Sequence, residues 1–174
     1  MANDQHEQHA AQRDRVAGEA AQHGSHQNPY ARLALMAFLS FAAMFVLMYA
    51  MVDRLANAVP NINQAYMAAL MAAPMVLIEV AIMGAMYKSR TWNAVTVGVS
   101  LIVFVLSFLA IRDQTAVGDA QFVRSMIPHH AGAVLMCEQA PITDPEIQQL
   151  CQGIVSSQQA EIAQMKTILR RLEG

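Results

Sequence analysis

Charged residues are scarce in this chain, and their scarcity excludes an ordinary soluble domain. Only 14% of the 174 residues are Asp, Glu, Lys or Arg, whereas 55% are apolar; globular domains carry about 25% charged residues. The net charge is −2 and no basic cluster is present, which excludes nucleic acid as a partner. Neither a glycine-rich phosphate loop nor an alternating strand pattern occurs. We therefore expect an all-α protein that sits partly in a membrane.

The chain contains three long runs of apolar residues that carry little or no charge. Three runs approach or exceed the roughly 20 apolar residues that cross a bilayer. They cover Leu33 to Val52, Tyr66 to Met86 and Trp92 to Ile111, and we predict a transmembrane helix for each. A cleaved signal peptide is the alternative for the first run, with Ala56-Asn57-Ala58 as a faint processing site. That run is too long for a signal peptide, and its polar leader spans 32 residues.

The second run carries two unusual residues. Glu79 is placed far from either end of the run, and burying an unpaired carboxylate there is costly, so we interpret it as functional or protonated. Pro74 should loosen the helix one turn earlier. Methionines recur at helical spacing in the first two runs and could line a copper path, although flexible packing or lipid contact is the more common role of such a stripe. They are Met44, Met48, Met51, Met67, Met71 and Met75.

These runs divide the chain into a polar leader over residues 1–31, a membrane unit over residues 32–111 and a carboxyl-terminal segment over residues 112–174. Basic residues near the span ends are more numerous on the leader's side, which predicts a cytoplasmic leader and an extracytoplasmic carboxyl-terminal segment. The leader lacks the apolar residues of a core and is predicted to be disordered. Its four histidines favour a solvated leader over a metal-collecting tail, because imidazole pairs without a scaffold bind weakly. They are His6, His9, His23 and His26.

The carboxyl-terminal segment is predicted to form a helical hairpin. Asp119 can cap the first helix. Pro128 lies inside this helix and predicts a kink or an opened turn. Residues at alternating spacings of three and four indicate a buried seam that turns His129 inward. The predicted seam consists of Phe122, Met126, His129, Ala133 and Met136.

The second helix of the hairpin has a strong start signal. Pro141 breaks the chain, Thr143 and Glu146 form a capping box, and Pro145 suits the first turn. One inward stripe then continues to the end of the chain. It comprises Ile147, Cys151, Ile154, Gln158, Glu161, Met165, Ile168 and Leu172.

Thioether and imidazole donors meet in this predicted hairpin. Met126 and His129 have the spacing at which carboxylate bundles place Glu-x-x-His, with sulfur in place of the hard oxygen. Antiparallel folding should place the two adjacent histidines opposite Gln158, with Met126 near Glu161. Such a donor set suits copper, Cu(I) in particular. A metal-free core, in which the histidines pair with Glu and Gln, fits the spacing equally well.

The chain contains two cysteines, Cys137 near the end of the first helix and Cys151 in the second. In an extracytoplasmic compartment a disulfide between them would staple the hairpin near its loop. Ligation of copper as thiolates is the competing role.

One run of residues resembles a known family. Gly118-Asp119-Ala-Gln-Phe122, the run Met126-Ile-Pro-His129-His130, Met136-Cys137 and Gln158-x-x-Glu161-Ile162-x-x-Met165 are similar to the bacterial domain of unknown function 305 family. The resemblance covers about the last third of the chain. It implies a ferritin-like helical domain and periplasmic copper binding, and together with the three predicted spans it leads us to expect a place in the bacterial inner membrane. The three predicted membrane helices of this chain depart from the arrangement common in the family, which has a secretory signal and no further spans. The implied metal residues are Met126, His129, His130, Met136 and Met165, with Glu161 as an outer partner.

A hairpin of about 60 residues is marginal as a separate core, so we expect a homodimer that completes a four-helix bundle, or docking on the membrane unit. The expected function is membrane-anchored copper sequestration, tolerance or hand-off to a copper transporter or chaperone, without catalysis. A metal-free interaction module of a membrane assembly is the alternative. A metal-dependent oxidase is less favoured, because repeated Glu-x-x-His pairs are lacking.

Overall fold

The computed structural model describes residues 28–84 and 86–174, and within these residues every regular element is helical. The predicted all-α class is therefore confirmed for this part of the chain, whereas the leader histidines His6, His9, His23 and His26 lie outside it. The elements are α2 (Pro29–Leu47), η1 (Met48–Met51), η2 (Leu55–Asn57), α3 (Ile62–Ile82), α4 (Arg90–Arg112), α5 (Asp119–Gln139) and α6 (Pro145–Glu173).

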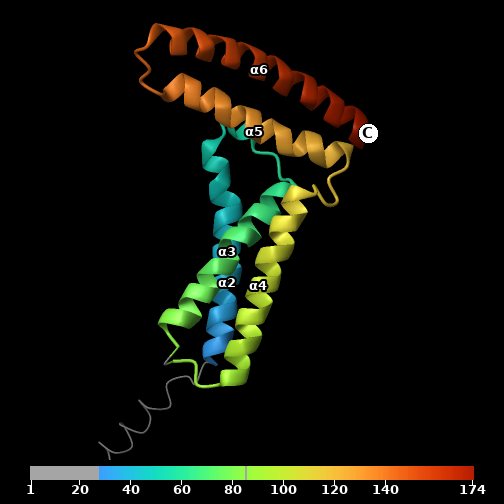
Figure 1. The fold of residues 1–174 in the computed structure, drawn as a ribbon. Helices are drawn as coiled ribbons and strands as arrows, with labels where there is room; N and C mark the ends of the chain where they lie inside the picture. Colours follow the sequence, from blue (N-terminus) through green and yellow to red (C-terminus); the bar gives the residue numbers. More distant parts are fainter. Residues whose placement is uncertain (1–27, 85) are drawn as a thin grey trace, which may run out of the picture.

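Helices α2, α3 and α4 run alongside one another and form the membrane unit (Figure 1). All three are long and apolar enough to cross a membrane. Each begins at a polar side chain that accepts a backbone N–H of the first turn, as helix starts require. These caps are Asn28, Asn61 and Ser89. The three runs of the sequence therefore correspond to three separate helices with defined starts.

Glu79 lies in the last turn of α3, which ends at Ile82, so its predicted place far from a span end is wrong. The apolar run continues past the helix to Met86, and hydropathy alone does not mark where a helix stops. The hydroxyl of Tyr87, in the loop after α3, donates to Glu79 Oε1 at 3.4 Å. Burial raises the pKa of Tyr87, and the nearby Glu79 carboxylate raises it further. The helix continues through Pro74 without interruption.

Tyr30 closes the same end of the membrane unit. Its hydroxyl lies 2.8 Å from Asn93 Oδ1 and accepts the Ser89 N–H at 3.3 Å. Its ring packs against Tyr87 and Trp92, with centroids 5.4 and 6.1 Å away. These contacts tie the start of α2 to the start of α4.

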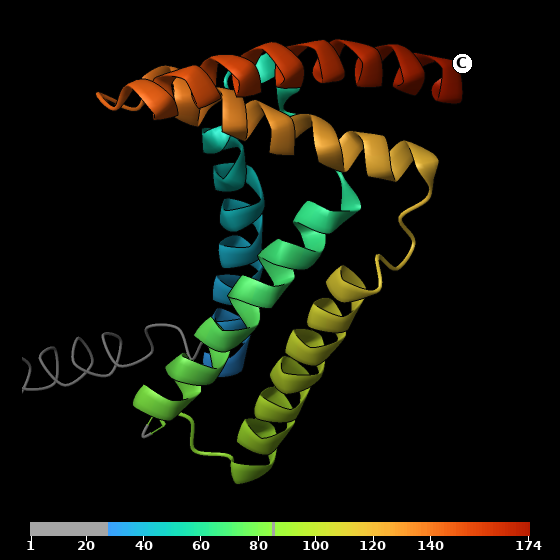
Figure 2. The same ribbon diagram turned by 45° about the horizontal axis from the view of Figure 1, so that its top comes forward.

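Helices α5 and α6 form the predicted antiparallel hairpin, which lies across the other end of the membrane unit (Figures 1 and 2). Helix α5 lies between α6 and the membrane helices in both views. Gln121 Oε1 accepts the Ile62 N–H at 3.1 Å, and Asn63 Nδ2 donates to Ser125 Oγ at 3.2 Å. Gly132 leaves space for a close approach, since a Cβ there would lie 3.4 Å from the Met51 carbonyl oxygen. One face of α5 therefore rests on the membrane unit.

Both predicted caps of the hairpin are shifted by one residue. Gly118 is the N-cap of α5, and Asp119 occupies the first helical position instead. Asp144, not Thr143, caps α6 by accepting the N–H groups of Glu146 and Ile147. Pro145 follows as the first residue of α6, because its missing N–H costs nothing there. Helix α5 runs unbroken through Pro128, so of the predicted kink or opened turn the opened turn is not formed.

The predicted seam of α5 is wrong. Phe122 and Met136 are 54% and 55% exposed, and His129 is also exposed. The buried cluster contains Val123, Ile127 and Ala131 of α5 together with Ile162 of α6. Val52 and Val59, in the segment between α2 and α3, pack against it. The sequence holds two stripes of helical spacing one residue apart. The Val/Ile stripe is buried because α5 must face both α6 and the membrane unit.

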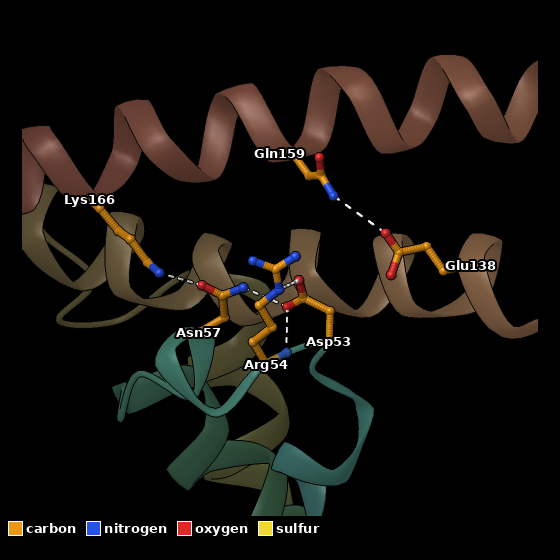
Figure 3. A network of polar contacts seen from close by, with 6 residues as sticks. All are labelled: Asp53, Arg54, Asn57, Glu138, Gln159 and Lys166. Atoms are coloured by element: carbon orange, nitrogen blue, oxygen red, sulfur yellow. Dashed lines mark hydrogen bonds and ion pairs between the residues drawn. The ribbon is translucent and has the colours of Figure 1, made fainter.

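A polar network joins the η2 segment to the hairpin (Figure 3). Asp53 Oδ1 accepts from the Arg54 N–H and from Asn57 Nδ2, which holds the asparagine in place. Lys166 of α6 donates to Asn57 Oδ1. Gln159 donates to Glu138 across the hairpin at 3.4 Å. The network fixes one flank of the hairpin against the membrane unit.

Candidate metal site

His130 and Glu161 meet at the centre of the hairpin. His130 Nε2 lies 2.7 Å from Glu161 Oε2, and Nδ1 lies 2.9 Å from the Met126 carbonyl oxygen. The histidine is 8% exposed, whereas the glutamate side chain is 52% exposed. Both ring nitrogens therefore already have partners within the hairpin.

These partners determine what His130 can do chemically. A carbonyl oxygen and an ionised carboxylate only accept hydrogen bonds. His130 then donates from both nitrogens, or donates from Nδ1 to the carbonyl while Nε2 accepts a hydrogen bond from a protonated Glu161 carboxyl group. In either arrangement neither ring lone pair is free for a metal ion. The contacts at His130 match the satisfied-core interpretation rather than direct ligation.

The His130–Glu161 contact sets the register of the two antiparallel helices. Met165 follows Glu161 by four residues and Met126 precedes His130 by four, so the two methionines lie at the same level. This register corrects the expected juxtaposition of Met126 with Glu161. Met165 is half-buried beside the Val/Ile cluster, and Met126 is half-buried as well. Two thioethers thus share one level of the hairpin.

His129 lies one helical turn from Met126 on the same side of α5, and it is exposed. The prediction that it faces inward is wrong. Its ring centroid lies 6.0 Å from that of His130. Among residues 28–84 and 86–174 no hydrogen bond to the His129 ring is found, which makes it the stronger candidate of the two histidines.

Met136 does not belong to this level. It follows Met126 by ten residues, which is about 15 Å along a helix and too far for both sulfurs to bind one ion. Gln158 was expected opposite the histidines, and its Oε1 is buried without a hydrogen-bond partner among the described residues. The predicted set of six metal residues therefore separates into a group around Met126, His129 and Met165, the His130–Glu161 pair, and the distant Met136.

The cysteines form the predicted disulfide, with 5.3 Å between the Cα atoms of Cys137 and Cys151. This pairing removes the competing role as thiolate ligands. Within residues 28–84 and 86–174, no group of three or more His, Cys, Asp and Glu side chains has the geometry of a metal site.

The methionines of α3 face outward. Met67, Met71 and Met75 are all exposed on the surface of the membrane unit, where lipid would surround them. This position is typical of lipid contact and does not line a path between the helices.

Sequence reasoning missed two features that position the site. The first is that Met126 and Met165 lie at the same level of the hairpin. This depends on the register of the two helices, which pairing His130 with Glu161 in the sequence would have given. The second is the hydrogen bond between Lys166 and Asn57, which helps to fix the hairpin. Nothing in the sequence indicated this contact, because 109 residues separate the two side chains.

Comparison with known proteins matches the hairpin to a protein family. Residues 110–173 match the family described as Domain of unknown function (DUF305). The uncharacterised protein L153 of Acanthamoeba polyphaga mimivirus is 31% identical over 150 residues, which cover 82% of this chain and 95% of that protein. No solved structure matches. The chain belongs to the DUF305 family.

The similarity to the viral protein is informative beyond the hairpin. Its 150 aligned residues are more than twice the length of the matched domain, so they include much of the membrane unit. The similarity to this relative therefore extends beyond the matched domain into the segment that forms α2 to α4. The expected bacterial source rests on the resemblance alone, since this relative is viral.

Proposed function

We propose that this protein is a membrane-anchored binder of a soft metal ion, with Cu(I) as its cargo. Helices α2 to α4 insert in the membrane with the amino-terminal side cytoplasmic, and the hairpin lies beyond the opposite leaflet. The proposal includes no catalytic step. It describes capture of copper for sequestration or for hand-off to a copper transporter or chaperone.

The observation that carries the proposal is the common level of Met126 and Met165 beside an exposed His129. Two thioethers and one imidazole are neutral, soft donors, and such donors select Cu(I) over the harder divalent ions. They also survive in an oxidising compartment, where the disulfide Cys137–Cys151 persists. His130 and Glu161 hold the register of the helices and thereby the spacing of the donors.

The test is a Cu(I) titration of the full-length protein against a competing chelator. Met126→Leu and Met165→Leu conserve side-chain volume and remove sulfur, so each should weaken Cu(I) binding by about tenfold or more. His129→Ala should do the same. Met136→Leu is the matched control, since that methionine lies about 15 Å from the site along α5. Equal affinity of wild type, Met126→Leu and Met165→Leu would reject the site.

A metal-free interaction module is the second candidate. It is favoured by one observation, the complete pairing of both His130 ring nitrogens within the hairpin. In that case the adjacent histidines His129 and His130 are structural, and wild-type protein shows no Cu(I) binding above that of His129→Ala.

A further inference from the structure

A cavity lies between the η2 segment and α6, within the polar network of Figure 3. Its volume is about 320 Å³. Asp53, Arg54 and Asn57 line it from the segment between α2 and α3, whereas Ile162 and Lys166 line it from the hairpin. None of the soft donors of the candidate metal site lines it, so the cavity is a separate feature of the fold.

Two cationic side chains enter this cavity from opposite sides. Figure 3 shows the Arg54 guanidinium group reaching toward α6 and the Lys166 side chain reaching from α6 toward the η2 segment. The Arg54 side chain is 77% exposed, and its ion pair with Asp53 joins Nε to Oδ2 at 3.9 Å. Within residues 28–84 and 86–174 its terminal guanidinium nitrogens have no hydrogen bond. Lys166 spends one of its three N–H donors on Asn57 Oδ1. Both cations therefore keep N–H donors for a ligand.

The charges that line the cavity favour an anion. Asp53 is acidic and only 7% exposed, and its Oδ1 atom accepts hydrogen bonds from the Arg54 backbone N–H and from Asn57. Arg54 and Lys166 contribute a charge of +2 and Asp53 a charge of −1, which leaves a lining of +1. Glu138 belongs to the network but does not line the cavity.

The types of donor indicate the class of anion. A guanidinium group binds two oxygens of one anion through parallel N–H donors, and an ammonium group acts as a point charge on a further oxygen. A carboxylate has two oxygens, and the guanidinium fork would occupy both. Inorganic phosphate or a phosphate monoester has a third terminal oxygen, which Lys166 can bind. The volume of the cavity is at the small end of ligand pockets, as a phosphate group requires.

We propose that this cavity binds a phosphate group between Arg54 and Lys166. Arg54 lies in the segment after α2 and Lys166 lies in α6, so the bound phosphate bridges the membrane unit and the hairpin. It reinforces the hydrogen bond that already joins Lys166 to Asn57. The phosphate belongs to a soluble molecule or to a lipid headgroup, since the η2 segment lies just beyond the end of a membrane helix. Phosphate binding is independent of copper binding.

The site is tested by calorimetric titration of full-length, metal-free protein in detergent with inorganic phosphate at constant ionic strength. Wild type should bind one phosphate per chain. Arg54→Gln and Lys166→Gln should each bind at least about tenfold more weakly, because a charged hydrogen-bond donor is lost. Arg171→Gln is the matched control, since it removes the same charge from α6 at a position that does not line the cavity. Its affinity should equal that of wild type.

Asp53→Asn should change the affinity in the opposite direction. Asparagine keeps an Oδ1 acceptor for the N–H groups of Arg54 and Asn57, and it removes the negative charge that faces the ligand. Phosphate should therefore bind more tightly to this variant than to wild type. General damage to the fold would produce weaker binding instead.

Saturating phosphate should also slow hydrogen exchange in residues 53–57 and 159–166 of wild type, because one ligand ties the two segments together. Three results would each overturn the site. These are no phosphate binding by wild type, equal affinity of wild type and Arg54→Gln, and weaker binding by Asp53→Asn. Circular dichroism shows that each variant is folded.

The source of the phosphate is distinguished by repeating the titration in lipid nanodiscs. Phosphatidic acid presents a terminal phosphate in its headgroup, whereas phosphatidylglycerol is anionic without one. Weaker binding of inorganic phosphate in nanodiscs that contain phosphatidic acid than in those that contain phosphatidylglycerol assigns the cavity to a lipid headgroup. Equal affinity in the two nanodiscs assigns it to a soluble phosphate.

Discussion

His130 and Glu161 join the two helices of the hairpin through a 2.7 Å contact between Nε2 and Oε2. The pair lies midway along α5 and sets the level of every donor in the candidate site. Its position makes it the natural starting point for tests of how the hairpin is built.

Replacing Glu161 tests whether its hydrogen bond with His130 stabilises the hairpin. Glu161→Leu leaves a buried His130 N–H without an acceptor, which should lower the free energy of unfolding by about 1–3 kcal/mol. Glu161→Gln keeps an acceptor oxygen and should cost less than about 1 kcal/mol. Thermal unfolding of metal-free protein, followed by circular dichroism, measures both. Equal losses in the two variants would contradict a hydrogen-bond role.

The disulfide should account for much of the stability near the hairpin loop. Cys137 and Cys151 close a loop with a sequence separation of 14, and opening it should cost about 3 kcal/mol through the entropy of the unfolded chain. Reduction, or the double change of both cysteines to Ala, should increase hydrogen exchange first around residues 137–151. The spans α2 to α4 provide an internal control, with unchanged exchange.

Ala116 in the loop between α4 and α5 has φ of 58°, in the left-handed region that L-residues disfavour. Ala116→Gly should therefore raise the free energy of unfolding by about 0.5–1 kcal/mol, since relief of strain exceeds the added entropy of the unfolded chain. The same change at Ala160, an exposed helical position of α6, should instead cost about 1 kcal/mol. Chemical denaturation of both variants measures the two effects, and a loss of stability in Ala116→Gly would contradict the assigned strain.

Ionisation of Tyr87 should make the stability of the fold depend on pH in the alkaline range. Burial, and then the Glu79 carboxylate, raise the pKa of this tyrosine in the fold. The fold therefore favours the neutral phenol. The resulting stability is complete below the ordinary tyrosine value of about 10 and is lost as the pH rises through the higher folded value. Tyr87→Phe should reduce the fall in unfolding temperature above about pH 10. A variant with the same alkaline profile as wild type would remove Tyr87 as its cause.

The spans and the hairpin were predictable because each depends on local sequence. An uncharged run of about 20 residues has few alternatives to a membrane helix. A proline directly after a capping residue, such as Pro145, favours a helix start through local geometry alone. The disulfide was also predictable, since the short loop brings Cys137 and Cys151 to neighbouring levels. Helix ends were predicted less well, and Glu79 was misplaced because an apolar run continues into the loop after α3.

The candidate site was predicted only in part, because periodicity cannot choose between two stripes one residue apart. Both the stripe of Phe122 and Met136 and the stripe of Val123 and Ile127 have helical spacing. The choice depends on what lies around α5, and part of that surrounding comes from Val52 and Val59, some 70 residues earlier in the chain.

The sequence by itself determined which segments are helical, which of them are apolar enough for a membrane, and which residues carry sulfur and imidazole. Only the tertiary structure decided that His130 is paired with Glu161, that His129 is exposed and that Met126 lies level with Met165. The physical reason is that helix formation and hydropathy are properties of neighbouring residues. The rotation of a helix about its own axis is set by every surface packed against it.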